Sequence, residues 1–402
     1  MRDTYLVFGQ PLIEEMEIEE VVKSLRSAWL GTGPKVAAFE KLVAEYKGVR
    51  HAVALNSCTA GLHLSCIAAG LQSGDEVIVP ALTFCATVNA VIHAGATPVL
   101  ADVEPGSFNL DSADVRRKIS PRTKAIIPVH FAGRACNMEA LTAIAREHKL
   151  VIIEDCAHAI ETEYQGRTAG SIGECGVLSF YSTKNIVTGE GGMVLTDNDE
   201  IAARIKILAL HGMSKDAWSR FSDNGYKHYD VVEIGFKYNM MDLQAAIGIH
   251  QIGRVEKYWL RRASIWERYN EALADLPLSL PPPVDPGTRH AYHLYPILID
   301  ERRATISRDE FILALHRRQI GTGVHYRAIP TYSMYGHRFG WRGEDYPNAE
   351  AIGRSTVSLP LSAKLTDQDV EDVITAVREV LTTAALSCRA ARIPSFLPKY
   401  DN

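Results

Sequence analysis

The stretch Val177-Leu178-Ser179-Phe180-Tyr181-Ser182-Thr183-Lys184-Asn185 stands just before a glycine-rich turn, Gly189-Glu190-Gly191-Gly192. Upstream of it, the apolar run Leu150–Ile153 leads directly into Glu154-Asp155. A short apolar run rich in β-branched residues is typical of a buried strand, and glycines allow strands to approach closely. We therefore expect one strand that delivers two carboxylates at its end, and two further strands on either side of Lys184.

Short apolar runs alternate with helical patterns between about residues 50 and 200. The predicted strands are His51–Leu55, Glu76–Val79, Thr97–Ala101, Lys124–Val129, Leu150–Ile153, Gly176–Tyr181 and Gly192–Thr196, and helices are predicted from Thr59 to Leu71 and from Thr83 to His93. Because these runs are apolar on both faces, we expect helices to cover both sides of the sheet. The succession of strand, helix and strand predicts a mostly parallel α/β sheet with right-handed crossovers.

The pattern changes near residue 250 and predicts a second, smaller α+β domain. Its predicted elements are a long helix Met241–Leu276 interrupted near Gly253, a strand Tyr292–Ile299, and helices Ser307–Arg318 and Thr366–Leu381. We therefore expect a large domain over residues 1–252 and a small one over residues 253–402. The last residues, from about Ala384, show no clear periodicity and are expected to be loosely held.

Composition narrows the class of protein. The chain has 402 residues, 47% of them hydrophobic, and a formal net charge of −5 without a block of basic residues, which disfavours nucleic acid as a partner. No apolar stretch reaches the roughly 20 residues needed to span a bilayer, so no membrane partner is expected. The seven cysteines include no Cys-x-x-Cys pair. We therefore expect free thiols in the reducing cytoplasm and no metal site.

Lys184 and Asp155 are the leading candidates for chemistry. A lysine amine can bond to an aldehyde and move a proton, and a carboxylate can hold a pyridine nitrogen protonated. Pyridoxal 5'-phosphate (PLP) chemistry requires both groups. A lone loop lysine is usually a solvated charge, and a lone strand-end aspartate is often an N-cap or half of an ion pair. Their combination favours the cofactor.

A candidate phosphate site lies between the first predicted strand and helix, at Asn56-Ser57-Cys58-Thr59-Ala60-Gly61. Backbone N–H groups and the dipole at a helix N-terminus attract anions. Ordinary N-capping by Ser57 or Thr59 explains the same residues. The hydroxyl of Ser179 could add to a phosphate site.

Three more residues each have two interpretations. His158 could orient Asp155 or touch a cofactor, or it could be a structural histidine. Phe84 could stack on a flat ring, although an aromatic side chain is more often part of a core. Asn239 stands just before a predicted helix, where an N-cap is the default interpretation.

These motifs together resemble the DegT/DnrJ/EryC1/StrS family of PLP-dependent sugar aminotransferases, over about residues 8–382. The segments 56–61, 154–159, 179–192 and 235–242 occur in the family's order and spacing. The segments 122–130 and 321–327 are similar to the UDP-4-amino-4-deoxy-L-arabinose–oxoglutarate aminotransferase type. The resemblance implies fold type I of the PLP-dependent transferases, with a mostly parallel seven-stranded sheet in the large domain and a smaller C-terminal α+β domain.

The resemblance also implies roles for the cofactor-binding residues. Lys184 would bond covalently to PLP and shuttle protons, and Asp155 would hold the pyridine nitrogen. His158 stands where many relatives have glutamine and would lie beside the ring. Cys58 stands where Gly or Ala is usual, and with Thr59 it would hold the phosphate.

The remaining implied roles involve residues farther along the chain. Ser179 would also hold the phosphate, and Phe84 would stack on the ring. Asn239 would reach the phosphate from the neighbouring subunit of a homodimer. His325 and Tyr326 would line the substrate site.

We expect, on this basis, ping-pong transfer of an amino group from L-glutamate, released as 2-oxoglutarate, to a nucleotide-linked ketosugar, at C4. Lys184 argues against the similar sugar dehydratases, which have histidine at that position. A keto-inositol (cyclitol) aminotransferase that uses glutamine is the alternative enzyme. A PLP-binding regulator without turnover is the alternative outside enzymes.

Overall fold

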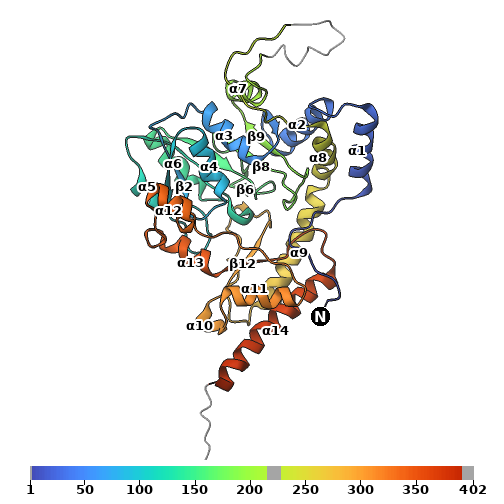
Figure 1. Cartoon of the computed structure of the whole chain (residues 1–402), viewed down its shortest axis with the longest axis vertical. Helices are drawn as coiled ribbons and strands as arrows, with labels where there is room; N and C mark the ends of the chain where they lie inside the picture. The colour runs from blue at the N-terminus through green and yellow to red at the C-terminus, as the bar shows by residue number, and fades with distance from the viewer. Residues whose placement is uncertain (1, 215–227, 392–402) are drawn as a thin grey trace, which may run out of the picture.

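Seven strands form the central sheet of the computed structural model, which describes residues 2–214 and 228–391 (Figure 1). They are β1 (His51–Leu55), β2 (Glu76–Pro80), β3 (Thr97–Ala101), β4 (Thr123–Ile126), β5 (Val151–Asp155), β8 (Cys175–Ser179) and β9 (Gly192–Thr196). The spatial order is β1-β9-β8-β5-β4-β2-β3. Strands β3, β2, β4, β5 and β8 pair in parallel, and β9 runs antiparallel to both β8 and β1. The prediction of a mostly parallel seven-stranded α/β sheet is confirmed.

Helices pack on both faces of this sheet. They are α2 (Pro34–Lys47), α3 (Cys58–Ala68), α4 (Cys85–His93), α5 (Ser112–Lys118), α6 (Met138–His148) and α7 (Asp199–Ala209), with the 3-10 turn η1 (Phe131–Gly133). Helix α3 begins at Cys58, one residue earlier than predicted, because the Ser57 hydroxyl accepts the N–H of Ala60. It ends at Ala68, three residues before the predicted Leu71. Two residues farther on, Gly70 adopts a left-handed φ of +80°.

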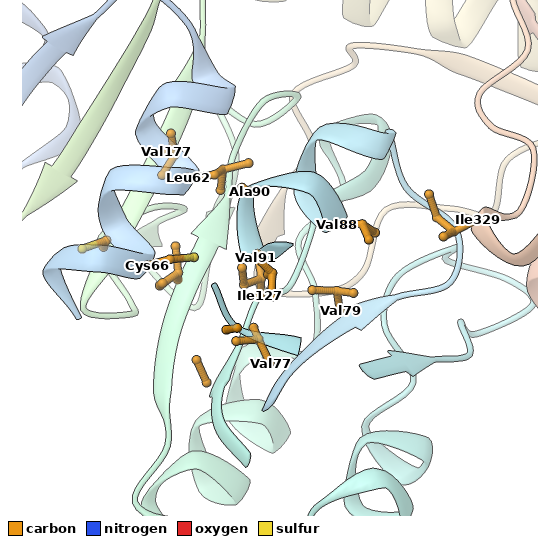
Figure 2. Packing of buried hydrophobic residues seen from close by; sticks show 14 of the residues in the cluster. Leu62, Cys66, Val77, Val79, Val88, Ala90, Val91, Ile127, Val177 and Ile329 are labelled. Atoms are coloured by element: carbon orange, nitrogen blue, oxygen red, sulfur yellow. The ribbon is translucent and has the colours of Figure 1, made fainter. Parts of the chain in front are cut away.

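The two faces of β2 show how the core is divided. Val77 and Val79 pack with Leu62 and Val88, from helices α3 and α4, in one hydrophobic cluster (Figure 2). Ile78, between them in sequence, belongs to a second cluster on the other face of the sheet. Both faces of the strand are therefore buried, as its uninterrupted apolar sequence predicts.

Strand β4 is shorter than the sequence predicts. It ends at Ile126 instead of Val129. Pro128 has no backbone N–H to add to the ladder, which interrupts the strand, although its carbonyl still accepts the N–H of Asp155 and Val129 forms an isolated bridge with Asp155. Strand β5 does the opposite and continues to Asp155, which places both carboxylates inside the strand.

The C-terminal part combines a small sheet with helices (Figure 1). Its elements are β11 (Tyr295–Leu298), β12 (Thr356–Leu359), α9 (Val255–Leu273), α10 (Glu301–Ala304), α11 (Arg308–Arg317), α12 (Ser333–Phe339), α13 (Pro347–Ser355), α14 (Asp367–Ala391), η3 (Ile329–Thr331) and η4 (Gly343–Asp345). Strand β11 starts at Tyr295 and not at the predicted Tyr292, because Tyr292 has a φ of +50°, incompatible with a strand. Helix α14 continues to Ala391, so residues 384–391 are helical and not irregular; residues 392–402 lie outside the described part.

The remaining elements surround these two parts. They are α1 (Glu15–Ser27), α8 (Asp242–Ile252) and a three-stranded sheet of β6 (Glu163–Tyr164), β7 (Arg167–Thr168) and β10 (Thr288–Arg289). Figure 1 shows α1, α2 and α8 beside one another at the edge of the large sheet. The predicted interruption of the long helix near Gly253 is present between α8 and α9.

We propose that residues 1–252 and 253–402 form the two domains. A separate hydrophobic cluster around Tyr269, Tyr295, Phe311 and Val377 supports the second one. Leu6 also packs in that cluster, so the N-terminal segment crosses to it. Among the described helices, none combines the length and the apolar character that a bilayer crossing requires.

Candidate active site

A cavity of about 470 Å³ opens at the C-terminal ends of β5 and β8 and the N-terminus of α3. Ligands bind at this edge of open α/β sheets. Nine of the ten predicted site residues line it: Cys58, Thr59, Phe84, Asp155, His158, Ser179, Lys184, His325 and Tyr326. The tenth, Asn239, does not.

Asp155 lies buried at the end of β5. Its Oδ2 accepts a hydrogen bond of 2.8 Å from Thr87, and its Oδ1 accepts one of 3.1 Å from the N–H of Ala157. Burial raises the pKa of Asp155, because the charged form loses its hydration. A cationic group in the cavity would offset that cost, and a protonated pyridine nitrogen is such a group.

Lys184 lies in the loop between β8 and β9. Desolvation lowers the pKa of Lys184 to about 8, although Cys58 and Asp155 act in the opposite direction. This shift leaves a minority of the amine, roughly a tenth at pH 7, in the neutral form that an attacking amine must have. The loop is held by hydrogen bonds from Lys184 N to Tyr181 O and from Phe180 N to Gly191 O, both of 2.9 Å.

The N-terminus of α3 forms an anion cradle. Ser57 caps the helix, as the simpler interpretation of this motif predicts, and it satisfies only the N–H of Ala60. The N–H groups of Cys58 and Thr59 are the first two of the helix and have no intrahelical partner. Gly192 lies directly against this turn, since a Cβ there would lie 2.3 Å from the carbonyl carbon of Ser57. The glycine thus brings β9 and the cradle together.

His158 and Tyr326 form a pair in the wall of the cavity. His158 Nδ1 accepts the N–H of Ala132 at 3.2 Å, and Nε2 lies 3.1 Å from the Tyr326 hydroxyl. Desolvation, with Lys184 nearby, lowers the pKa of His158 well below its usual value. The ring is therefore neutral, its proton is on Nε2, and it donates to Tyr326. His158 does not orient Asp155, because Ala157 and Thr87 donate to that carboxylate. His158 does line the cavity, so its contact with a cofactor stays a prediction.

His325 and Phe84 also line the cavity. Nδ1 of His325 lies 2.9 Å from the Ser358 hydroxyl, and its ring packs 5.4 Å from that of Phe8. Desolvation lowers the pKa of His325 to about 3. Phe84 is 56% exposed and lies 5.8 Å from the ring of Tyr326, so it is not a core residue.

Asn239 lies away from the cavity of its own chain. Its Nδ2 donates 2.6 Å to the Thr32 hydroxyl, and its backbone pairs with Leu55. Its buried Oδ1 has no hydrogen-bond partner among the described residues. It does not cap α8, whose N-cap is Met241.

Sequence analysis missed several residues of the cavity wall, among them Phe8, His293 and Leu361. Each lies in a segment without a recognisable motif, far along the chain from Lys184. Only the three-dimensional fold brings them to the site.

Glu154, the residue before Asp155, belongs to a buried cluster of metal-ligand-type side chains that hydrogen bonding explains. His130, Glu154 and Cys156 place ligand-type atoms within 4.8 Å of one another. However, the Glu154 carboxylate accepts hydrogen bonds from His130 and from the N–H groups of Gly170, Ile172 and Gly173. Its lone pairs are used to anchor the end of β5, which explains the cluster without a metal ion.

These features fit PLP. The buried Asp155 suits the pyridine nitrogen, Lys184 suits the aldehyde, and the cradle at Cys58 and Thr59 suits the phosphate. Fold and site together define a PLP-dependent aminotransferase. The chain belongs to the DegT/DnrJ/EryC1/StrS aminotransferase family, whose model matches residues 11–378.

Known relatives agree with this assignment. The chain is 47% identical over 384 residues to the spore coat polysaccharide biosynthesis protein SpsC of Bacillus subtilis (strain 168), covering 95% of this chain and 99% of SpsC. Among solved structures, the putative sugar aminotransferase Spr1654 of Streptococcus pneumoniae in its PMP form matches with a TM-score of 0.88 and 32% identity, over 96% of this chain and 100% of Spr1654. Helicobacter pylori PseC, an aminotransferase of pseudoaminic acid biosynthesis, matches with a TM-score of 0.87 and 28% identity, over 95% and 100% of the chains.

Proposed function

We propose that this enzyme transfers the amino group of L-glutamate to the keto carbon, at C4, of a nucleotide-linked ketosugar. The observation that carries the proposal is that Lys184 and the buried Asp155 line one cavity together with histidine and tyrosine side chains. The names of SpsC and PseC place those two relatives in polysaccharide and pseudoaminic acid biosynthesis, which supports a sugar acceptor.

Each residue has a distinct task in this proposal. When bound, PLP accepts an amino group from one substrate and passes it to the carbonyl carbon of the next. Lys184 holds the cofactor between turnovers and moves a proton at Nζ. Asp155 keeps the ring nitrogen protonated, the N-terminus of α3 and Ser179 hold the phosphate, and Phe84 stacks on the ring.

We also propose a homodimer with shared sites, acting in the cytoplasm. Phe84 and Tyr181 line the cavity yet are 56% and 46% exposed, as expected of apolar surface that a second subunit covers. The partner's Asn239 would then reach the phosphate. The cysteines among the described residues are free thiols, which supports a reducing compartment.

Absorbance spectroscopy of the purified protein with PLP tests the proposed reaction. We expect a band from the lysine-linked cofactor that shifts to the pyridoxamine form when L-glutamate is added and returns when a ketosugar nucleotide is added. Lys184→Ala should abolish both the band and turnover. UDP-4-amino-4-deoxy-L-arabinose, assayed in reverse, tests the type that the sequence resembles.

Other outcomes of the same titration would contradict the proposal. A band that ignores glutamate but responds to glutamine, with turnover of aminocyclitols, would identify a keto-inositol aminotransferase. Bound cofactor that reacts with no amino donor would identify a regulator.

A further inference from the structure

A line of buried hydrogen bonds leads from helix α9 to the active-site cavity. Arg262 and Glu161, each no more than 2% exposed, form an ion pair. Asn185 Nδ2 donates to Glu161 Oε2 at 2.8 Å and to the carbonyl of Ala291 at 3.0 Å. Asn185 Oδ1 lies 2.9 Å from Nδ1 of His293, which lines the cavity.

The direction of every hydrogen bond in this line follows from its first member. Arg262 is always charged and can only donate, so Glu161 is ionised and can only accept. Two acceptors, Glu161 and the Ala291 carbonyl, therefore face the Asn185 amide, and its Nδ2 must point to them. The amide oxygen is left to face His293, so His293 Nδ1 must carry the proton and donate.

His293 therefore has one free lone pair, on Nε2. Desolvation, with Lys184 and other positively charged groups nearby, lowers the pKa of His293 well below its usual value, so the ring is neutral. No described residue provides a hydrogen-bond partner for Nε2. The ring packs against that of His158, with centroids 4.4 Å apart at 35°, which keeps it in the cavity wall.

We propose that Nε2 of His293 accepts a hydrogen bond from a hydroxyl of the sugar substrate and so helps to select it. The inference rests on the proposed function and adds a recognition residue to it. The two substrates differ in the hydrogen bonds that they can make. Apart from the amino group that reacts, an amino acid donor offers only carboxylates, which are acceptors and would be repelled by a lone pair, whereas sugar hydroxyls can donate. His293 should therefore matter for the sugar half-reaction alone.

The two half-reactions of purified holoenzyme test this inference. His293→Gln keeps an acceptor near the position of Nε2, whereas His293→Met keeps only the approximate length of the side chain. His290→Gln is the matched control, because His290 is also buried but does not line the cavity. The probes are L-glutamate, and UDP-4-amino-4-deoxy-L-arabinose or another aminosugar nucleotide that the wild-type enzyme accepts.

In His293→Met we expect kcat/KM for the aminosugar to fall about ten-fold, the value of one hydrogen bond, while the glutamate half-reaction stays within about two-fold. His293→Gln should recover part of the loss, and His290→Gln should show none. Equal loss in both half-reactions, or none in either, would overturn the role of His293. A wild-type enzyme that reacts with glutamate but with no aminosugar nucleotide would overturn the proposed function, and this inference with it.

Discussion

Thr87 donates a hydrogen bond of 2.8 Å to Asp155, from helix α4 to the end of strand β5. The Thr87 hydroxyl has only one hydrogen, so the Thr83 hydroxyl, 2.9 Å away, must donate to Thr87 in turn. This buried pair of hydroxyl groups stabilises the charged form of Asp155 against a burial that raises its pKa.

Thr87→Val should therefore weaken PLP binding, by several-fold at neutral pH. Loss of the donor raises the pKa of Asp155 further, so the carboxylate becomes protonated at a higher pH as the solution is acidified. The PLP dissociation constant, measured by fluorescence between pH 5 and 8, should increase at a higher pH in the variant than in wild type. Thr83→Val, which touches Asp155 only through Thr87, should have a smaller effect. Identical pH curves for wild type and Thr87→Val would contradict this explanation.

Lys184→Met should stabilise the cofactor-free protein at neutral pH. The pKa of Lys184 is lowered from 10.5 to about 8 on folding, so the folded state disfavours the protonated amine. This penalty is complete below pH 8 and disappears as the pH rises to about 10.5. Because Lys184 still meets solvent in the cavity, we expect a gain of about 2 kcal/mol at pH 7. Urea unfolding at pH 7 and at pH 10 measures it; an equal gain at both would show that the charge is not responsible.

Gly192→Ala should abolish cofactor binding. The added Cβ would lie 2.3 Å from the carbonyl carbon of Ser57 and 2.4 Å from the N of Cys58, and both are backbone atoms that cannot swing aside. The cradle and β9 must then separate. Gly106→Ala is the matched control, since its Cβ meets no heavy atom within 4 Å. The bound-cofactor absorbance of the two soluble proteins gives the comparison, and a normal band in Gly192→Ala would refute the close approach.

Hybrid dimers test the shared site. If the partner's Asn239 completes each site, a mixture of Lys184→Ala and Asn239→Ala subunits contains hybrids with one intact site. After unfolding and refolding in equal amounts, we expect about one quarter of wild-type activity, although each variant alone is far weaker. If Asn239 served its own chain, no hybrid site would be intact, and mixing would restore nothing.

The sequence was sufficient for the sheet and for placing nine of the ten predicted site residues on one cavity, because these depend on local signals. Apolar runs located the strands. Asp155 stands at a strand end, the capped turn at Ser57 starts a helix, and Lys184 lies in the loop between two predicted strands. The first helices, α1 and α2, were not predicted. Strand β12 was also missed, since four residues carry little periodicity.

Other features could not be predicted because they depend on contacts distant in sequence. His293 reaches the cavity only through the fold, and its proton position depends on Arg262, whose charge acts through two other residues. Tyr292, the first residue of a predicted strand, is excluded from it by a positive φ. Its residue type does not indicate that backbone conformation. Asn239 is present in the expected motif, yet the fold places it outside the cavity of its own chain.

The hairpin between β8 and β9 has a consequence for the order of folding. Ser179 and Gly192, which close this hairpin, are paired in the sheet and separated by only a short loop. Closing a short loop costs little chain entropy, whereas the helix α3 cradle must be brought from more than a hundred residues away. We expect the lysine loop to form early and the anion cradle to dock on it later, so that the group that bonds to the cofactor is in place before the group that holds its phosphate.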